Sequence, residues 1–425
     1  MTRPPNFIVV MADDLGYGDV GCEGGQLIRT PNIDRMAAEG VRFTDFYASA
    51  NVCTPSRAGL LTGRYAIRHG LAEQVIQPDD GRGLPLSEVT IPKALGAGYA
   101  SAIVGKWHLG HMAPYWPPTQ YGFEQFHGLA YSHDMKPLVM FDGDVGEPLT
   151  ESAVDFPKLT QRFFEQTLAF AEANRERPFF IYLALTAPHV PLDPNPDDLT
   201  GSPAGAYGEV VEEIDLNMGR LFEGLRRLGI EEDTLVVFTS DNGPWFEGSS
   251  GPFRDRKGGS AWDGGFRVPF LVRQPGTVPA GEVRTGLASN LDLLPTLCRM
   301  AGVAAPEVEL DGRDLTDVIL ADAPSPNEEI VLFDNARIAA VRTDRWKYVV
   351  RSYYRTYDIP LDRFGYPLLF DMRADPGERY GLARLHPEVV DEMKARVERA
   401  RAKYDPIAKT FPKWEPPAGG VKHRD

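Results

Sequence analysis

Four short runs of apolar and β-branched residues stand out along the chain, and polar residues follow each of them at once. The runs cover residues 6–11, 100–104, 179–185 and 234–239. Their length and continuous apolar character are typical of strands buried inside a parallel sheet. Stretches with helical periodicity lie between them, the clearest at residues 159–174 and 209–228.

This alternation of strands and helices predicts an α/β fold in which helices flank a large, mostly parallel sheet. Sheets of this kind bind their ligands outside the carboxyl ends of the strands. We therefore expect the polar residues that follow the four runs to lie on one rim of the sheet, although they are far apart in the sequence. These residues are Asp13, Asp14, Lys106, His108, His189, Asp241 and Asn242.

The pattern changes after about residue 320, where short apolar runs follow one another with close turns. These runs cover residues 329–333, 338–343, 346–353 and 367–370. They predict a smaller antiparallel sheet, and the charged amphipathic stretch 387–404, with a proline at its first turn, predicts a helix. We expect the tail 406–425 to be an extended or loose end. The chain thus divides into a large domain, residues 1–325, and a smaller α+β domain, residues 326–425.

Composition narrows the classes of function. The 425 residues are 43% hydrophobic and 25% charged, and their net charge of -15 opposes binding to nucleic acid or to anionic membranes. An anionic substrate would therefore need a local group of cations. No apolar run reaches the roughly 20 residues that a membrane helix needs, and no secretory signal is visible at the N-terminus. The three cysteines indicate a reducing compartment, so we expect a cytoplasmic protein.

The segment C-T-P-S-R at residues 53–57 combines a thiol, a cation and a helix-starting pattern. Its proline, followed by good helix formers, predicts that a helix begins at Cys53. Free backbone N–H groups and the positive end of the helix dipole would then face the rim, as a site for a tetrahedral oxyanion. Arg57 adds a cation one turn further on. We expect the other cysteines, Cys22 and Cys298, to be packed as small apolar residues.

The same segment runs on as A-G-L-L-T-G-R-Y, and this extended block resembles the signature of the type I sulfatase family, within the alkaline-phosphatase-like superfamily. The resemblance is strong over residues 6–269 and weaker beyond. It implies an alkaline-phosphatase-like fold in a catalytic domain that hydrolyses a sulfate monoester to an alcohol and inorganic sulfate. It also implies that a formylglycine-generating enzyme oxidises Cys53 to formylglycine.

A hydrated aldehyde suits this reaction better than a thiol, because it carries two hydroxyls on one carbon. One hydroxyl attacks sulfur and forms a covalent sulfate hemiacetal. Loss of a proton from the other then expels sulfate and restores the aldehyde. Water therefore never has to attack the sulfated enzyme.

Polar residues after two of the strands form an all-oxygen set, which is typical of a site for a hard cation. The set comprises the carboxylates of Asp13, Asp14 and Asp241 and the amide of Asn242. Oxygen ligands favour Ca²⁺ or Mg²⁺, and the resemblance favours Ca²⁺, which the group derived from Cys53 would also contact. Asp13 with Asp14, or Asp241 with Asn242, would by itself be an ordinary turn-forming pair after a strand.

Lys106 and His108 are two residues apart, so in an extended segment both side chains would point to the same side. By resemblance, Lys106 contacts sulfate and His108 takes the proton from the second hydroxyl. The resemblance also implies that His189 contacts sulfate near the leaving group and that Lys257 protonates or neutralises the leaving oxygen. The candidate catalytic residues are therefore Cys53, Arg57, Lys106, His108, His189 and Lys257.

Two further groups of residues have less defined roles. Asp263 stands where the family usually has glutamate before two glycines, and we expect this shortened acid to be structural. Aromatic residues of the predicted pocket loops either stack on a substrate ring or pack within the protein, and His111 and His133 are candidates to line the pocket. These aromatic residues are Tyr115, Trp116, Tyr131, Trp245 and Phe246.

Two other functions stay open. A phosphonate monoester hydrolase or phosphodiesterase of the same superfamily would share the sheet and the metal rim, although a two-metal phosphatase would need further histidine and aspartate ligands. A binding protein in which Cys53 stays a thiol would share the fold without the activity. The sequence also leaves open the oligomeric state and the substrate, which could be an aryl sulfate, a sulfated carbohydrate or a small alkyl sulfate.

Overall fold

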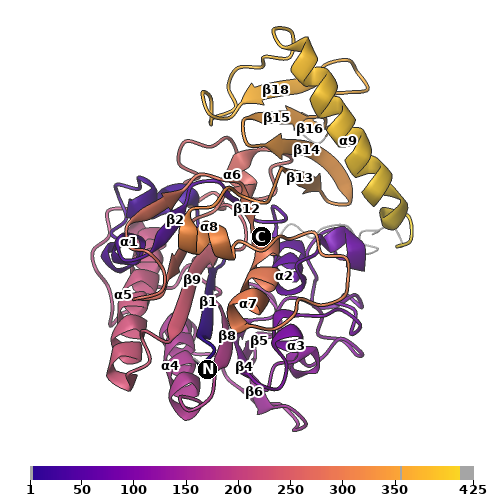
Figure 1. Ribbon diagram of the computed structural model, residues 1–425. Coiled ribbons are helices and arrows are strands. Elements are labelled where there is room, and N and C mark those ends of the chain that lie inside the picture. The colour runs from indigo at the N-terminus through magenta and orange to yellow at the C-terminus, as the bar shows by residue number, and fades with distance from the viewer. Residues whose placement is uncertain (1–2, 355–356, 412–425) are drawn as a thin grey trace.

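A ten-stranded sheet forms the centre of the fold, which Figure 1 shows as a computed structural model. The structure describes residues 3–354 and 357–411. Neighbouring strands follow the order β11-β2-β10-β9-β1-β8-β4-β5-β6-β7, and the strands from β9 to β5 run parallel. Antiparallel pairs join β10 to the sheet on one side and β6 and β7 on the other. The predicted large, mostly parallel sheet is confirmed.

The four predicted strands are the central strands of this sheet. They are β1 (Asn6–Ala12), β4 (Ala100–Lys106), β8 (Phe179–Ala184) and β9 (Thr234–Ser240). Every residue in them is buried, because helices cover both faces of the sheet. The other strands of the sheet are β2 (Val41–Phe43), β5 (Gln125–Leu129), β6 (Met140–Asp144), β7 (Thr150–Ser152), β10 (Phe270–Arg273) and β11 (Glu282–Arg284). A separate pair joins β3 (Phe46–Tyr47) to β12 (Ala288–Ser289).

Side chains of β1 alternate between two hydrophobic cores, because successive residues of a strand point to opposite faces. Phe7 and Val9 belong to one core and Ile8 and Val10 to the other. The first core includes α2 (Cys53–Thr62), α3 (Ile91–Leu95), α7 (Leu293–Ala301) and α8 (Thr316–Ala321). The second includes α1 (Pro31–Ala38), α4 (Leu159–Ala173) and α5 (Gly205–Leu228). The two predicted helices correspond to α4 and α5.

A separate antiparallel sheet follows, as predicted. Its strands are β13 (Glu329–Asp334), β14 (Arg337–Thr343), β15 (Trp346–Val349) and β18 (Leu368–Asp371), with α9 (Pro387–Ala408) lying across them (Figure 1). The single strand predicted at 346–353 is wrong, because the N–H groups of Val350 and Arg351 both donate to the carbonyl of Ala339 and interrupt the ladder. The chain then forms β16 (Ser352–Tyr354), which pairs with β17 (Tyr357–Ile359).

The C-terminal helix is longer than predicted. The expected extended tail began at Pro406, but α9 continues through this proline to Ala408. Proline removes one intrahelical hydrogen bond, and this close to the helix end the remaining turn still forms. Residues 412–425 of the predicted tail lie outside the described residues. Side chains of α9 share one hydrophobic core with those of α2 and α7, so separate cores do not mark the two predicted domains. The domain boundary at 325/326 therefore stays a prediction.

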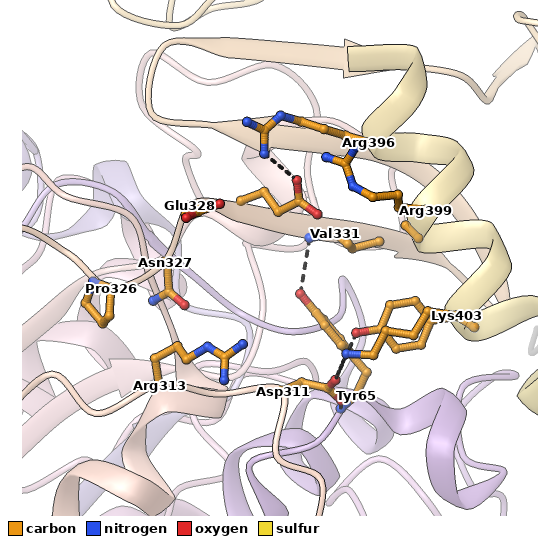
Figure 2. A pocket seen from close by; sticks show the side chains of 13 residues that line it. Tyr65, Asp311, Arg313, Pro326, Asn327, Glu328, Val331, Arg396, Arg399 and Lys403 are labelled. Atoms are coloured by element: carbon orange, nitrogen blue, oxygen red, sulfur yellow. Dashed lines mark hydrogen bonds and ion pairs between the residues drawn. The ribbon is translucent and has the colours of Figure 1, made fainter. Parts of the chain in front are cut away.

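Polar contacts fill the seam between α9 and the loops of the larger part, around a pocket of about 430 Å³ (Figure 2). Arg396 pairs with Glu329 at 2.7 Å, and Asp311 accepts a hydrogen bond from Tyr404 at 2.8 Å. None of the candidate catalytic or metal-binding residues lines this pocket. We therefore regard it as part of the attachment of the C-terminal helix. Within the described part of the chain, no helix is both long and apolar enough to cross a bilayer.

Candidate active site

The predicted polar residues lie together where β1 and β9 end. The backbone N–H of Asp14 donates to Oδ1 of Asp241 at 3.1 Å, and the side-chain amide of Asn242 donates to Oδ1 of Asp14 at 2.8 Å. Asp13, Asp14, Asp241 and Asn242 are all at most 1% exposed. Asp14 also has a left-handed backbone, with φ at 66°, a strained conformation that is common at functional sites. The expectation that these residues share one rim is confirmed.

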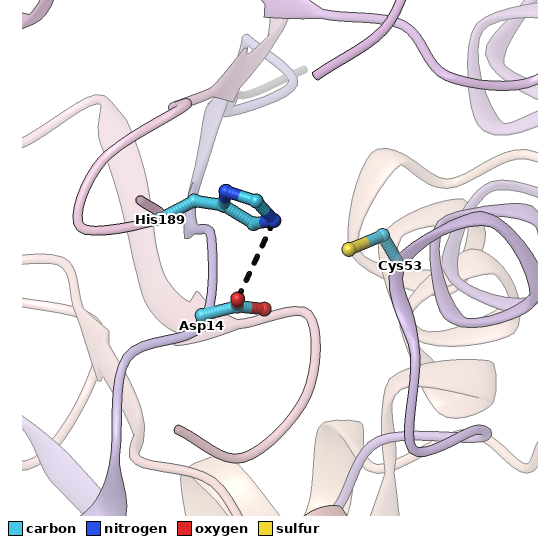
Figure 3. A group of neighbouring side chains, drawn as sticks. All are labelled: Asp14, Cys53 and His189. Carbon is cyan, nitrogen blue, oxygen red and sulfur yellow. Dashed lines mark ion pairs between the residues drawn. The ribbon is translucent and has the colours of Figure 1, made fainter. Parts of the chain in front are cut away.

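α2 brings Cys53 to the same rim. The helix begins at Cys53, as predicted, and every residue of α2 is buried. Sγ of Cys53 lies 3.5 Å from Oδ1 of Asp13. Figure 3 shows the thiol pointing toward Asp14 and His189, whose Nε2 is 3.6 Å from Oδ2 of Asp14. A helix start, a thiol and two acidic strand ends therefore meet at one point.

Three cations face the three carboxylates of this cluster. The pairs are Arg57 with Asp241 at 2.9 Å, Lys106 with Asp13 at 2.7 Å, and Lys257 with Asp14 at 2.7 Å. The side chains of Arg57 and Lys106 are completely buried, whereas that of Lys257 is 11% exposed. The cluster thus brings three cations together in a protein whose net charge is -15, each of them beside a carboxylate. This is the arrangement that an anionic substrate needs.

Burial and ion pairing perturb the acidic groups in opposite directions. Burial alone would raise the pKa of Asp13, but the cations of Lys106 and Arg57 outweigh it and hold this pKa well below its ordinary value. Burial is also the largest influence on Asp241, and it raises that pKa against the effect of Arg57. Burial likewise raises the pKa of the Cys53 thiol. The unmodified thiol is therefore neutral near pH 7 and a weak nucleophile.

His108 is held by the backbone around it. Its φ of 59° means that residues 106–108 are not extended, so the geometric reason we gave for pairing Lys106 with His108 is wrong. Instead, Oγ1 of Thr54 donates to the carbonyl of His108 at 3.0 Å, and Nε2 of His108 lies 2.9 Å from the carbonyl of Ile76. Thr54 stands inside the signature block, but only the fold brings Ile76 to this position.

These contacts fix the proton of the imidazole. A carbonyl can only accept, so Nε2 of His108 carries the hydrogen and Nδ1 keeps its lone pair. Among the described residues, this buried Nδ1 has no hydrogen-bond partner. Burial, and after it the charge of Lys106, holds the pKa of His108 well below its ordinary value. The ring is therefore neutral and able to accept a proton at Nδ1.

The acidic cluster fits a divalent cation. Ligand atoms of Asp13, Asp14, Cys53 and Asp241 all lie within 4.8 Å of one another. Oδ1 of Asn242 is buried and, within residues 3–354 and 357–411, accepts no hydrogen bond, although buried acceptors are nearly always satisfied. A cation would satisfy this oxygen. Carboxylate and amide oxygens are the donors that Ca²⁺ and Mg²⁺ prefer.

Asp263 lies outside this cluster, at the start of the short helix α6 (Asp263–Phe266). Its carboxylate accepts from Nζ of Lys347 at 2.6 Å and from the hydroxyl of Tyr47 at 2.8 Å, and its N–H donates to Glu378 at 2.8 Å. Lys347 and Glu378 belong to the C-terminal part of the chain. These buried bonds fit the structural role expected for Asp263, because they tie that part to the segment that follows Lys257.

Comparison with known proteins decides the family. The model of the sulfatase family matches residues 5–303, and that described as N-sulphoglucosamine sulphohydrolase, C-terminal, matches residues 257–403. The chain belongs to the sulfatase family. It is 39% identical to arylsulfatase A of Homo sapiens over 445 residues, which cover 93% of this chain and 87% of that protein.

Solved structures agree with this assignment. The PsFucS1 sulfatase from Pseudoalteromonas sp. is 28% identical, with a TM-score of 0.86 over 97% of this chain and 92% of its own. Ps i-CgsB, in complex with k-i-k-neocarrahexaose, is also 28% identical, with a TM-score of 0.79 over 93% and 92% of the two chains. This sulfatase is therefore a sulfuric ester hydrolase of the type I family, with the alkaline-phosphatase-like fold.

Proposed function

We propose that this sulfatase hydrolyses a sulfate monoester with formylglycine, made from Cys53, as its nucleophile. The observation that carries the proposal is the position of the Cys53 side chain at the first turn of α2, 3.5 Å from Asp13 and facing His189. A neutral, buried thiol would be a poor nucleophile there. The hydrated aldehyde supplies two hydroxyls on one carbon, one for attack on sulfur and one whose deprotonation releases sulfate. A formylglycine-generating enzyme is the partner required for maturation.

The cations of the site divide the remaining work. Arg57 and Lys106, together with the free N–H groups at the start of α2, would hold the sulfate oxygens and stabilise the charge that develops on them. Lys257 and His189 are more accessible than Arg57 and Lys106, with side chains 11% and 12% exposed. They therefore face the leaving alcohol, where Lys257 can donate a proton to the departing oxygen.

His108 is the proton acceptor for the release of sulfate. Its Nε2–H donates to the carbonyl of Ile76, and its Nδ1 has no partner in the described part of the chain, so the neutral ring can take one proton. Lys106 and Arg57 are engaged in ion pairs with nearby carboxylates and are therefore unsuited to this task. His108 thus complements the acid supplied by Lys257.

We further infer that Asp13, Asp14, Asp241 and Asn242 hold a divalent cation, with Ca²⁺ favoured and Mg²⁺ as the second choice. Oxygen atoms of Asp13, Asp14 and Asp241 lie within 4.8 Å of one another, and among the described residues the buried amide oxygen of Asn242 accepts no hydrogen bond, so a cation would satisfy it. A bound cation would polarise a sulfate oxygen and the attacking hydroxyl. The preference for Ca²⁺ or Mg²⁺ follows from the oxygen ligands that these four residues offer.

Two chromogenic esters with the same leaving group test the activity. We expect a higher kcat/KM for the aryl sulfate than for the matching phosphate, and a preference for phosphate would contradict the proposal. Cys53→Ala should lower kcat roughly a thousandfold or more, because the nucleophile is lost. Cys22→Ala is the matched control, because Cys22 is partly buried and lies outside the site, and it should retain activity. Full activity of Cys53→Ala would rule out residue 53 as the nucleophile.

A further inference from the structure

Two exposed aromatic residues follow the metal-binding asparagine almost directly. Trp245 is 38% exposed and Phe246 is 67% exposed. Their rings meet edge to face, with centroids 4.6 Å apart and an interplanar angle of 78°. Aromatic rings normally contribute to stability by leaving water, so a pair held on the surface beside an active site indicates a binding surface.

The loop that carries this pair is held firmly. The backbone N–H of Lys257 donates to the carbonyl of Pro244 at 3.0 Å. Nη1 of Arg256 donates to the carbonyls of Trp245 and Phe246 at 3.4 and 3.3 Å. Further along, the N–H of Ser249 donates to Asp19 at 2.9 Å. The exposure of the aromatic rings is therefore a fixed feature of the loop.

Trp245 faces the side of the site from which the alcohol leaves. Nζ of Lys257 lies 5.9 Å from the centroid of the indole and 2.7 Å from Oδ2 of Asp14. Lys257 thus stands between the acidic cluster and the aromatic ring. A group bonded to sulfate at the cluster would emerge past Lys257 and meet Trp245.

The charged residues beside the aromatic pair favour an anionic partner. The guanidinium of Arg256 lies 5.0 Å from the centroid of Phe246, and that of Arg254 lies 3.7 Å from the centroid of Trp262. Neither arginine pairs with a carboxylate within the part of the chain that the structure describes. Two exposed acids, Glu247 and Asp255, lie on the same loop, and among the described residues neither forms an ion pair with these arginines. The loop therefore offers two guanidinium groups to a ligand.

We propose that Trp245, Phe246 and Arg256 form a subsite for a sulfated saccharide, an inference that rests on the proposed sulfatase reaction. A pyranose ring that bears the scissile sulfate stacks on Trp245 as it leaves the acidic cluster. Arg256 pairs with a second sulfate or carboxylate on the same or the adjoining sugar, since guanidinium binds such groups with two parallel hydrogen bonds. A simple aryl or alkyl monosulfate has no second anion for this arginine.

Sulfate release from a panel of mono- and disulfated disaccharides and from methyl sulfate tests the subsite. We expect Trp245→Ala to lower the ratio of kcat/KM for the disaccharides to that for methyl sulfate by about fivefold, mainly through KM. Arg256→Ala should lower the ratio for disulfated over monosulfated disaccharides by about tenfold. Phe364→Ala removes another exposed ring, 64% exposed and in the C-terminal part, and should change neither ratio. Thermal unfolding checks that each variant is folded.

The outcomes separate this inference from the activity itself. Release of sulfate from methyl or aryl sulfate but from no disaccharide would overturn the subsite and leave the sulfatase reaction standing. Unchanged ratios in Trp245→Ala and Arg256→Ala would do the same. Failure of the unaltered, formylglycine-containing protein to release sulfate from any ester would instead contradict the proposed function. Trp245→Phe, which keeps a ring, should recover part of the loss caused by alanine.

Discussion

Single buried atoms determine the chemistry of the site. Among the residues described, neither Oδ1 of Asn242 nor Nδ1 of His108 has a hydrogen-bond partner. An unsatisfied buried acceptor lowers the stability of a folded protein by roughly 1–3 kcal/mol. Two such atoms beside three carboxylates therefore destabilise the fold unless a ligand binds to them. The first atom points to a cation and the second to a transferable proton.

Ca²⁺ should stabilise the folded protein, because it would bind the folded cluster and not the unfolded chain. At a free concentration about one hundred times its Kd, the gain in unfolding free energy is about 2.7 kcal/mol. Thermal unfolding after exhaustive chelation and after return of Ca²⁺ measures it. Asn242→Ala should lose part of the gain. Equal unfolding temperatures with chelator and with Ca²⁺ would contradict a cation at this cluster.

His108→Ala should slow the release of sulfate from residue 53 more than its transfer to the enzyme. We expect kcat to fall by about 10²–10⁴, the usual contribution of a positioned base. Sulfated residue 53 should then accumulate during turnover and be visible by peptide mass spectrometry. His386→Ala, in the C-terminal part, is the control and should behave as the unaltered enzyme. Loss of activity in His108→Ala without an accumulated sulfated peptide would count against this role.

The residues of the active site lie at the ends of strands and at the start of a helix, not in the middle of these elements. β1, β4 and β9 end at or just before the polar residues, and α2 starts at Cys53. Buried ion pairs also link elements that are distant in sequence. Nζ of Lys347, on β15, lies 2.6 Å from Asp263 and 2.7 Å from Glu378, and all three side chains are buried. This link holds the start of α6, a few residues after Lys257, against the C-terminal sheet.

Lys347→Met should therefore destabilise the fold. Removal of the cation leaves two buried carboxylates facing each other, a change that typically costs about 3–5 kcal/mol. Denaturant unfolding measures the loss, and the exposed Lys394→Met should differ from the unaltered protein by less than about 0.5 kcal/mol. Addition of Glu378→Gln to Lys347→Met should recover part of the stability. Equal stability of Lys347→Met and Lys394→Met would show that these buried ion pairs do not stabilise the fold.

Periodicity and spacing predicted the whole molecule better than its junctions. Apolar runs identified the four central strands. The rule that ligands bind at the carboxyl ends of such strands correctly predicted that Asp13 and Asp241 lie close together. The left-handed turn at His108 was not predictable, because bonds to Thr54 and Ile76 from other elements stabilise it. The break after β15 likewise depends on a carbonyl of the neighbouring strand. Tertiary contacts, which leave no local pattern, account for these differences.

Global stability should carry a pH dependence from Glu213 on α5. Burial raises the pKa of this carboxyl from 4.5 to about 7, because backbone hydrogen bonds such as that from the N–H of Asn195 offset the burial only in part. Because the folded protein holds the proton more tightly, the stabilising contribution is complete below pH 4.5 and is lost as the pH rises through 7. Glu213→Gln should therefore gain about 2–3 kcal/mol relative to the unaltered protein at pH 8.

Unfolding free energies of both proteins from pH 4 to pH 8 measure this dependence. The difference between them should grow between pH 4.5 and 7 and then level off. The exposed Glu223→Gln, on the same helix, is the control and should differ from the unaltered protein by less than about 0.5 kcal/mol. A constant difference for Glu213→Gln would show that burial does not perturb this group.

The mass of the peptide that contains residue 53 tests the central claim most directly. Oxidation of the Cys53 side chain from thiol to aldehyde lowers the mass by about 18 Da, so protein made together with a formylglycine-generating enzyme should yield a peptide lighter by that amount. Desulfation activity across preparations should rise in proportion to the converted fraction. Full activity in protein whose residue 53 is entirely unmodified cysteine would contradict the account.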